Sequence, residues 1–182
     1  MTPGPFAGLI SDELGQAVAR DDGRFDLIFE RRIKKPVEKV WAALTIPERL
    51  ADWFSPVELD LRVGGHYRIL FADIDYTVEG VITELEPLKR ITHTWPDSED
   101  PAYADAYVRY ELWPDGDGCR LRLTQTAVHR KYLGALAGWH VFFEALPGAC
   151  EGIRTLWTME RETEVGERYH DLLAAFPAPE GS

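Results

Sequence analysis

The sequence predicts one α+β domain in which an antiparallel sheet is followed by a long helix. Apolar and polar residues alternate in several short runs between residues 25 and 125, which is the pattern of strands with one buried face. From about residue 131 the apolar residues recur at helical spacing instead. The 182 residues are enough for one core. We therefore expect six or seven strands, an early pair of helices and a long late helix.

The stretch from residue 25 to residue 54 is expected to hold one strand and two short helices. In Phe25–Ile33 apolar residues alternate with polar ones except at Ile28, so one strand face is buried. Pro36 sits where the first position of a helix tolerates proline, and Pro47 falls in the first turn of a second helix.

The residues before this strand favour a hairpin. Gln16–Arg20 is expected to pair with the strand across an Asp22-Gly23 turn, because Asp-Gly is a strong hairpin signal. A short helix through Leu9, Leu14 and Val18 is the alternative. Residues 1–14 are expected to form a flexible N-terminal segment.

Six further strands are separated by turn signals. Their expected positions are Val57–Leu61, His66–Phe71, Tyr76–Glu84, Ile91–Trp95, Val108–Leu112 and Cys119–Gln125, the first being short. Gly80 is expected to mark a bulge that lets the sheet curl. The acidic segment Pro96–Ala106 is expected to be a mobile loop. Asp115–Gly118 is expected to be a hairpin turn, because the ligand spacing and closing Glu of a calcium loop are missing.

The last part of the chain is expected to be helical. An apolar stripe runs from Leu136 to Leu146, and Pro147-Gly148 bends or ends that helix. A last helix is expected over about Leu156–Phe176. The main domain is thus predicted over residues 15–150, with a helical extension and tail over residues 151–182.

Composition argues against two classes of partner. The chain has 31 acidic and 20 basic residues and a formal charge of −11, so it should repel nucleic acids and anionic membranes. No apolar run approaches the ~20 residues of a membrane helix, and the N-terminus lacks a leader pattern. Cys119 and Cys150 have no metal-ligand spacing and are expected to be reduced structural thiols of a cytoplasmic protein.

Motifs for catalysis, metals and cofactors are missing. The five histidines, at positions 66, 93, 129, 140 and 170, form no HxxxH or HExxH pair. There is no GxSxG elbow and no Gly-rich phosphate loop. We expect no metal, no cofactor and no nucleophilic residue.

The order and spacing of several runs resemble a known family. The runs are FERRI, KKPVEKVWAALT, IPERLADWF, DLRVGGHYRI, EGVITELEPLKRITHTW, YELWPDGDGCRLRLTQT and GWHVFFEAL. They resemble the family related to the C-terminal domain of the heat-shock-protein-90 ATPase activator, over roughly residues 15–150. That family belongs to the superfamily of the major birch-pollen allergen, the polyketide cyclases and the steroid-transfer domains. The resemblance implies a helix-grip fold, in which a curved antiparallel sheet wraps around a long C-terminal helix and leaves a cavity, and it allows a homodimer.

Eleven residues are candidates for contact with a small hydrophobic or amphipathic ligand in that cavity. Three polar ones, His93, Tyr110 and Gln125, lie on strand faces that the alternation places inward, and each needs a hydrogen-bond partner. Ordinary satisfaction within the core is the alternative to a ligand. The apolar candidates are Trp41, Trp53, Phe54, Tyr67, Phe71, Trp95, Trp139 and Phe143.

Three functions are compatible with these observations. The high aromatic content and the missing catalytic motifs favour a non-catalytic protein that binds a small hydrophobic molecule. A cyclase or hydratase that uses His93 as acid or base is the first alternative, although relatives often have His where Gln125 stands. A chaperone co-factor is the second, but the family's namesake acts with an additional N-terminal domain for which this chain has no room.

Overall fold

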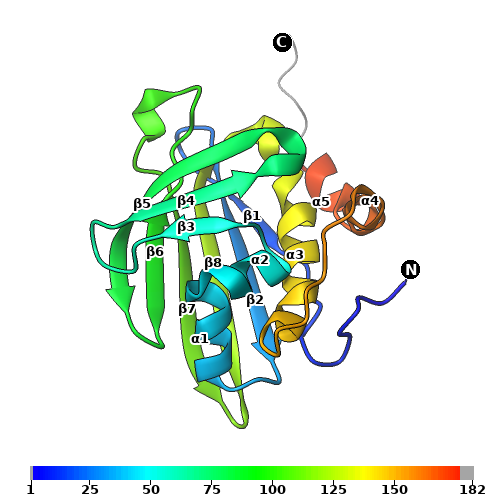
Figure 1. Ribbon diagram of the computed structural model, residues 1–182. Helices are drawn as coiled ribbons and strands as arrows, with labels where there is room; N and C mark the ends of the chain where they lie inside the picture. The colour runs from blue at the N-terminus through cyan, green and yellow to red at the C-terminus, as the bar shows by residue number, and fades with distance from the viewer. Residues whose placement is uncertain (1, 177–182) are drawn as a thin grey trace.

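Eight strands form one antiparallel sheet that curves around the helix α3 (Ala135–Ala149) in the computed structural model, which describes residues 2–176 (Figure 1). The strands are β1 (Gln16–Ala19), β2 (Phe25–Ile33), β3 (Val57–Leu59), β4 (His66–Phe71), β5 (Tyr76–Glu86), β6 (Arg90–Thr94), β7 (Tyr107–Asp115) and β8 (Gly118–Val128). The other α-helices are α1 (Val37–Thr45), α2 (Pro47–Trp53), α4 (Met159–Glu167) and α5 (His170–Ala174). Helix α3 lies on the concave face of the sheet, so the predicted helix-grip architecture is confirmed.

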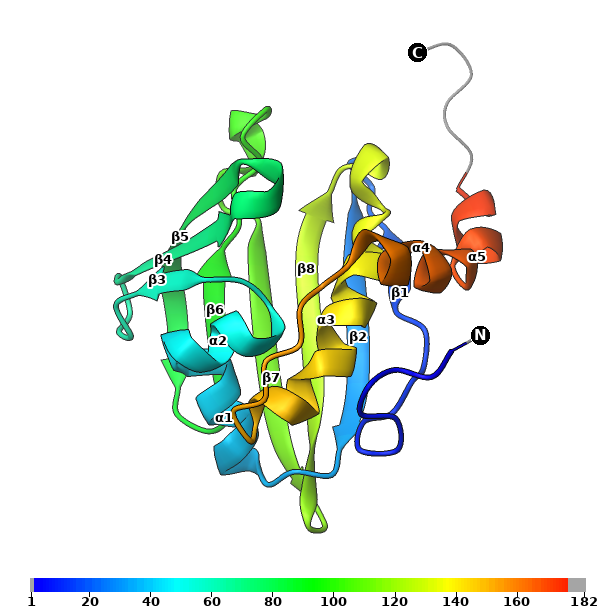
Figure 2. The same ribbon diagram turned by 45° about the vertical axis from the view of Figure 1, so that its right-hand side comes forward.

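The strand order is β1-β2-β8-β7-β6-β5-β4-β3. Every neighbouring pair is antiparallel, and successive strands from β3 to β8 pair with one another. Strand β2 pairs with β8, the strand farthest from it in sequence, with Phe29 opposite Leu123. The sheet stays open, with β1 and β3 at its two edges. Figure 2 shows the resulting half-barrel, with α1 and α2 at one end and α4 and α5 beside α3.

The predicted N-terminal hairpin is confirmed. Strand β1 pairs with β2, and the turn between them contains Gly23 at φ 80°, a conformation that favours glycine. Its backbone N–H donates to the carbonyl of Arg20 at 3.1 Å. Residues 2–14 precede this hairpin in turns, and Ser11 N–H donates to the Arg32 carbonyl at 2.8 Å. The flexibility expected of this segment stays a prediction.

Of the two early helices, the second begins at a proline, as expected. Pro47 is the first residue of α2. Pro36 lies one residue outside α1, as its N-cap at ψ 154°, so the prediction of Pro36 inside the helix is wrong by one position. Between the two helices, Ile46 is extended and its N–H closes α1 on the carbonyl of Ala42.

The sheet irregularity predicted at Gly80 lies elsewhere. Gly80 pairs in register with Tyr67, and the break in register falls between Ile82 and Glu84. Glycine is needed at position 80 for another reason, because a Cβ there would lie 2.3 Å from the carbonyl oxygen of Thr94. The residue marks a close approach of two backbones.

The long last helix expected over residues 156–176 is two short helices. Helix α4 begins after Thr158, whose side chain accepts a hydrogen bond from Arg161 N–H, and ends at Glu167. A turn at Arg168 and Tyr169 then separates α4 from α5, and it brings the fully buried Tyr169 against α3. The expected tail beyond residue 176 lies outside the described residues. None of the helices described is long and apolar enough to span a membrane.

Candidate functional site

A cavity of about 1100 Å³ lies between α3 and the ends of strands β4 and β8. Its volume is at the upper end of the range for small-molecule sites. Eight aromatic side chains line it: Phe54, Phe71, Tyr76, Trp95, Tyr132, Trp139, Phe142 and Trp157. Leu156 and Ile74, which are also in the lining, are largely exposed, so the cavity opens to solvent there. The site is an aromatic cavity that lies between the curved sheet and α3 and is open to solvent.

Small residues on α3 leave room for this cavity. Gly134, Ala135 and Gly138 all line it, and their spacing places them on one helix face. A Cβ at Gly138 would have as its nearest neighbour only Glu162 Oε2, at 3.7 Å. Larger side chains at these three positions would fill the space between the helix and the sheet. The small residues leave this space open.

A bulge brings four consecutive β8 residues to the cavity. In a regular strand alternate residues face opposite sides, yet Gln125, Thr126, Ala127 and Val128 all line it. The register explains this, because the three-residue step from Gln125 to Val128 on β8 faces a two-residue step on β2. Ala127 lies within this step and has a left-handed φ of 56°, which occurs in one type of bulge.

The floor of the cavity is built around Trp139. Its indole stacks on Phe54 with ring centroids 5.2 Å apart and planes inclined by 7°. Trp95 packs against it from the sheet side at 6.0 Å. Its Nε1–H donates to Gln125 Oε1 at 2.7 Å. Ring packing and one hydrogen bond therefore fix the orientation of this indole.

Charged groups gather at the mouth. Arg24 is 7 % exposed and forms ion pairs with Asp97 at 2.6 Å and Asp100 at 3.0 Å, which tie residues 96–106 to β2. On the other side of this loop Glu99 pairs with Lys131, which lines the cavity. The polar contacts of the loop thus hold it at the edge of the aromatic cavity.

Three of the predicted site residues lie behind the cavity wall. Tyr67, His93 and Tyr110 are buried, and the rings of Tyr67 and His93 stack at 3.8 Å. The hydroxyl oxygens of Tyr67 and Tyr110 and the Nε2 atom of His93 have no hydrogen-bond partner in the described part of the chain. Because the carbonyl of Thr94 can only accept, His93 Nδ1 carries the proton of the 3.0 Å hydrogen bond, and Nε2 is a bare acceptor.

Burial sets the protonation of this group. It lowers the pKa of His93 to about 4, so the imidazole is neutral at pH 7. Burial also raises the pKa of the Tyr67 and Tyr110 hydroxyls, which stay protonated. The three side chains form a neutral polar cluster one aromatic layer beneath the cavity, since Trp95 and Trp139 pack against His93 and Tyr110.

The remaining predicted residues divide between cavity and core. Five of the eleven candidates line the cavity: Phe54, Phe71, Trp95, Gln125 and Trp139. Trp53 and Phe143 are buried in the core, where their rings stack at 5.9 Å, and Trp53 Nε1–H donates to the Ala43 carbonyl. Trp41 is half-buried on α1, away from the cavity. Sequence reasoning missed Tyr76, Tyr132, Phe142 and Trp157.

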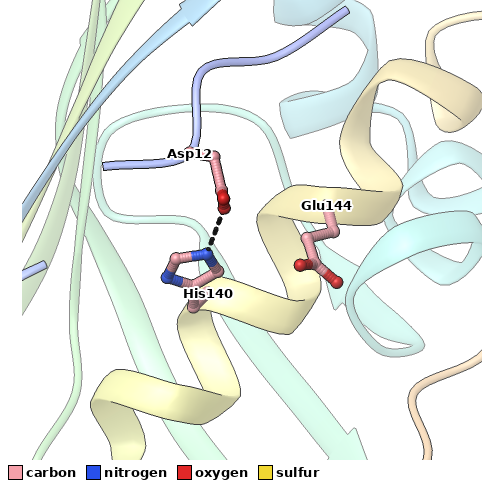
Figure 3. A group of neighbouring side chains, drawn as sticks. All are labelled: Asp12, His140 and Glu144. Carbon is pink, nitrogen blue, oxygen red and sulfur yellow. Dashed lines mark hydrogen bonds and ion pairs between the residues drawn. The ribbon is translucent and has the colours of Figure 1, made fainter. Parts of the chain in front are cut away.

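A second polar cluster lies on the opposite side of α3. His140 Nε2 lies 2.7 Å from Asp12 Oδ1 (Figure 3). Its Nδ1 lies 2.8 Å from the Tyr169 hydroxyl. That hydroxyl also accepts a hydrogen bond from Gly15 N–H. Because a carboxylate can only accept, Nε2 carries a proton that it donates to Asp12, and in the neutral imidazole Nδ1 accepts from the Tyr169 hydroxyl. Burial, with the charge of Arg31, lowers the pKa of His140 and agrees with this assignment.

The second cluster holds the chain ends together. None of Asp12, His140 and Tyr169 lines the cavity, and the Tyr169 hydroxyl is engaged with two partners. The hydrogen bonds instead join the N-terminal segment and the turn after α4 to the central helix. We interpret the cluster as a structural tether.

Asp12, His140 and Glu144 could offer three metal ligands within 4.8 Å of one another. Figure 3 shows that His140 and Glu144 project from α3 and that Asp12 reaches them from the N-terminal segment. Arginines already neutralise both carboxylates, since Arg168 lies 3.0 Å from Asp12 and Arg161 lies 2.6 Å from Glu144. A cation would have to displace two ion pairs, so the arrangement favours a salt-bridge network over a metal site.

The two cysteines are buried free thiols. Burial raises the pKa of Cys119 to about 12 and that of Cys150 to about 11. Both stay protonated at neutral pH, and a thiol is a much weaker nucleophile than a thiolate.

Comparisons with known proteins agree with this architecture. The family described as Activator of Hsp90 ATPase homolog 1-like protein matches residues 34–151. A comparison with curated proteins gives no match.

Three solved structures illustrate the likeness. The crystal structure of CalU16 from Micromonospora echinospora is 27% identical, with a TM-score of 0.68, over 87% of this chain and 95% of that one. Protein MLL2253 from Mesorhizobium loti is 32% identical, with a TM-score of 0.62, over 69% and 96%. The Aha1 dimer from Colwellia psychrerythraea is 20% identical, with a TM-score of 0.59, over 69% and 96%, which shows a shared fold.

Proposed function

Because this chain belongs to the family of Activator of Hsp90 ATPase homolog 1-like proteins and has an open cavity between its sheet and α3, we propose that it binds a small apolar molecule in that cavity. The observation that carries the proposal is the open volume of about 1100 Å³ with eight aromatic side chains in its lining. Aromatic surface of this kind gains free energy when a ligand removes it from water.

The packing around the cavity supports binding over a collapsed core. Trp139 is held by Phe54, Trp95 and Gln125, so the floor is formed before a ligand arrives. Gly134 and Gly138, close to Trp139 in the same part of the chain, have no side chains that would occupy the cavity. A preformed apolar site loses less free energy to ordering on binding than a mobile one.

Acid–base catalysis by His93 has less support. Its side chain is fully buried behind Trp95, and its lowered pKa leaves no proton on Nε2 at pH 7. A substrate in the cavity would therefore meet neither a general acid nor an accessible base at this position. We infer a role in binding, with no catalytic residue assigned.

The experiment is a titration with prodan, a neutral naphthalene ketone whose emission moves to shorter wavelength in apolar surroundings. We expect saturable, one-to-one binding with blue-shifted emission. Gly138→Leu should narrow the cavity and weaken binding, because Gly138 lines it and a Cβ there would meet only the Glu162 side chain, at 3.7 Å. Gly138→Ala is the matched control. It also replaces the glycine in the helix but adds only one methyl group, so it should retain most of the binding.

Two outcomes would contradict the proposal. One is a prodan emission wavelength that remains the same as in water at every protein concentration. The other is equal binding by Gly138→Leu and the wild type, which would place the dye elsewhere on the surface. Circular dichroism of both variants checks that α3 is intact.

Assembly and compartment complete the proposal. Aha1 from Colwellia psychrerythraea is a dimer, and we infer a homodimer for this chain by analogy of fold. Sedimentation at several concentrations tests it, and a monomer at all of them would refute it.

We also infer a cytoplasmic location, because two buried free thiols suit a reducing compartment.

A further inference from the structure

The hydrogen bond between Trp139 and Gln125 fixes which end of the Gln125 amide faces a ligand. An indole N–H can only donate, so the atom 2.7 Å from Trp139 Nε1 must be the carbonyl oxygen Oε1. The amide nitrogen Nε2 is then the free branch. It makes no hydrogen bond to any residue between positions 2 and 176, and Gln125 lines the cavity.

The other buried polar side chains of the cavity do not offer a free N–H donor. Besides Gln125, the buried polar residues of the lining are Ser55 and Thr126. Ser55 Oγ donates to the Leu70 carbonyl at 2.7 Å, and Thr126 Oγ1 accepts from Tyr107 N–H at 2.9 Å and faces its carbonyl at 3.4 Å. The Gln125 amide therefore presents two N–H donors deep in an aromatic site.

We propose that the ligand is an apolar molecule with a neutral hydrogen-bond acceptor, such as a ketone, ester or ether oxygen, which Gln125 Nε2 binds. This inference rests on the proposed function and narrows its ligand class. A buried donor rejects a molecule that cannot accept its hydrogen bond, and it rejects one with a donor of its own more strongly. The formal charge of −11 disfavours an anionic acceptor in a site that is largely apolar.

Three tricyclic molecules of the same shape separate the possibilities. Fluorenone carries an acceptor oxygen, fluorene carries no polar group, and carbazole carries an N–H donor. Each is used to displace bound prodan from the wild-type protein. We expect fluorenone to bind roughly three- to tenfold more tightly than fluorene, which is the range of one neutral hydrogen bond, and carbazole to bind most weakly.

Two variants assign the preference to the amide. Gln125→Leu, made together with Trp139→Phe because the indole N–H would otherwise become a free donor, removes the amide donors at similar size, so the affinities for fluorenone and fluorene should become equal. Trp139→Phe removes the indole N–H that holds the amide, so the amide can turn its oxygen toward the ligand. The disadvantage of carbazole should then disappear.

The outcomes separate this inference from the proposed function. If the three molecules bind with equal affinity to the wild type, the inference is wrong while the binding function stands. A fluorenone preference that survives in the double variant Gln125→Leu, Trp139→Phe also overturns it, because another donor would then be responsible. If neither prodan nor any tricycle binds, both are wrong. The wild-type comparison needs no variant, so misfolding of either variant leaves the test decisive.

Discussion

The phenol ring of Tyr67 lies parallel to the imidazole ring of His93, with centroids 3.8 Å apart and planes inclined by 5°. Both side chains have no exposed surface. Charging this imidazole would place a cation against unpaired hydroxyl groups and aromatic rings, away from water. The contact is therefore a source of pH dependence in the stability of the fold.

The first prediction concerns acid. His93 has a pKa of about 4 in the folded protein and 6.5 as an unperturbed group, so the unfolded chain holds more protons between these pH values. The stability associated with neutral His93 is complete above pH 6.5 and is lost as the pH falls toward 4. The loss is on the order of 3 kcal/mol for a shift of this size.

Urea unfolding at several pH values measures this effect. His93→Phe keeps a flat ring against Tyr67 and removes the titration, so its free energy of unfolding should fall less steeply between pH 6.5 and 4. Parallel curves for the variant and the wild type would assign the acid sensitivity to other groups.

The second prediction concerns the tether at α3. Tyr169→Phe removes a hydroxyl that serves both His140 Nδ1 and Gly15 N–H, and should lower the free energy of unfolding by about 1–3 kcal/mol. Tyr107→Phe is the matched control, because no hydrogen bond involves its hydroxyl in the part of the chain described. Prodan affinity should be unchanged in Tyr169→Phe, and a large change would mean that the tether also shapes the cavity.

The third prediction concerns the loop at the cavity mouth. Arg24→Gln removes ion pairs to Asp97 and Asp100 and the stacking of the guanidinium on Tyr103 at 4.0 Å. Amide hydrogen exchange in residues 96–106 should become on the order of tenfold faster, equivalent to about 1.4 kcal/mol of local stability. Arg20→Gln, whose ion pairs are more exposed, should leave that segment as it is. Equal exchange in both variants would show that other contacts hold the loop.

The fourth prediction compares two glycines. A Cβ at position 80 would lie 2.3 Å from the Thr94 carbonyl oxygen and 3.0 Å from that of Tyr67, so Gly80→Ala must push two strands apart. We expect a loss of about 1–3 kcal/mol of stability, as for other overpacked sites. Gly134→Ala meets nothing within 4 Å and should be neutral or slightly stabilising. Thermal unfolding of the two variants decides, and equal melting temperatures would contradict the close approach.

Local signals in the sequence were sufficient for most of the fold. The Asp22-Gly23 pair predicts the hairpin because its backbone preferences act within four residues. Pro47 starts α2 for a similarly local reason. The exception is the chain after Thr158, where the apolar spacing continues through a break that depends on the tertiary contact of Tyr169 with His140.

The cavity could be predicted less well because its walls depend on rotation and curvature. Phe142 and Phe143 are adjacent and both apolar, yet one lines the cavity and the other packs in the core against Trp53. The apolar spacing of α3 in the sequence does not reveal which apolar residues face the cavity and which face the core. His93 was correctly placed on an inner face, but alternation does not show that Trp95 separates it from the cavity.

The pairing of β2 with β8 has a consequence for synthesis of the chain. Strands β3 to β8 are joined in order, so each can add to its predecessor as it leaves the ribosome. Strand β2 must wait until its partner around Leu123 has been made, with Leu27 and Phe29 unable to reach their final neighbours. Such distant pairing slows folding and leaves an apolar strand face open to association with other chains. The nascent chain is therefore most vulnerable to aggregation before residue 128 emerges, and its β1–β2 ribbon is the segment left without its partner during that time.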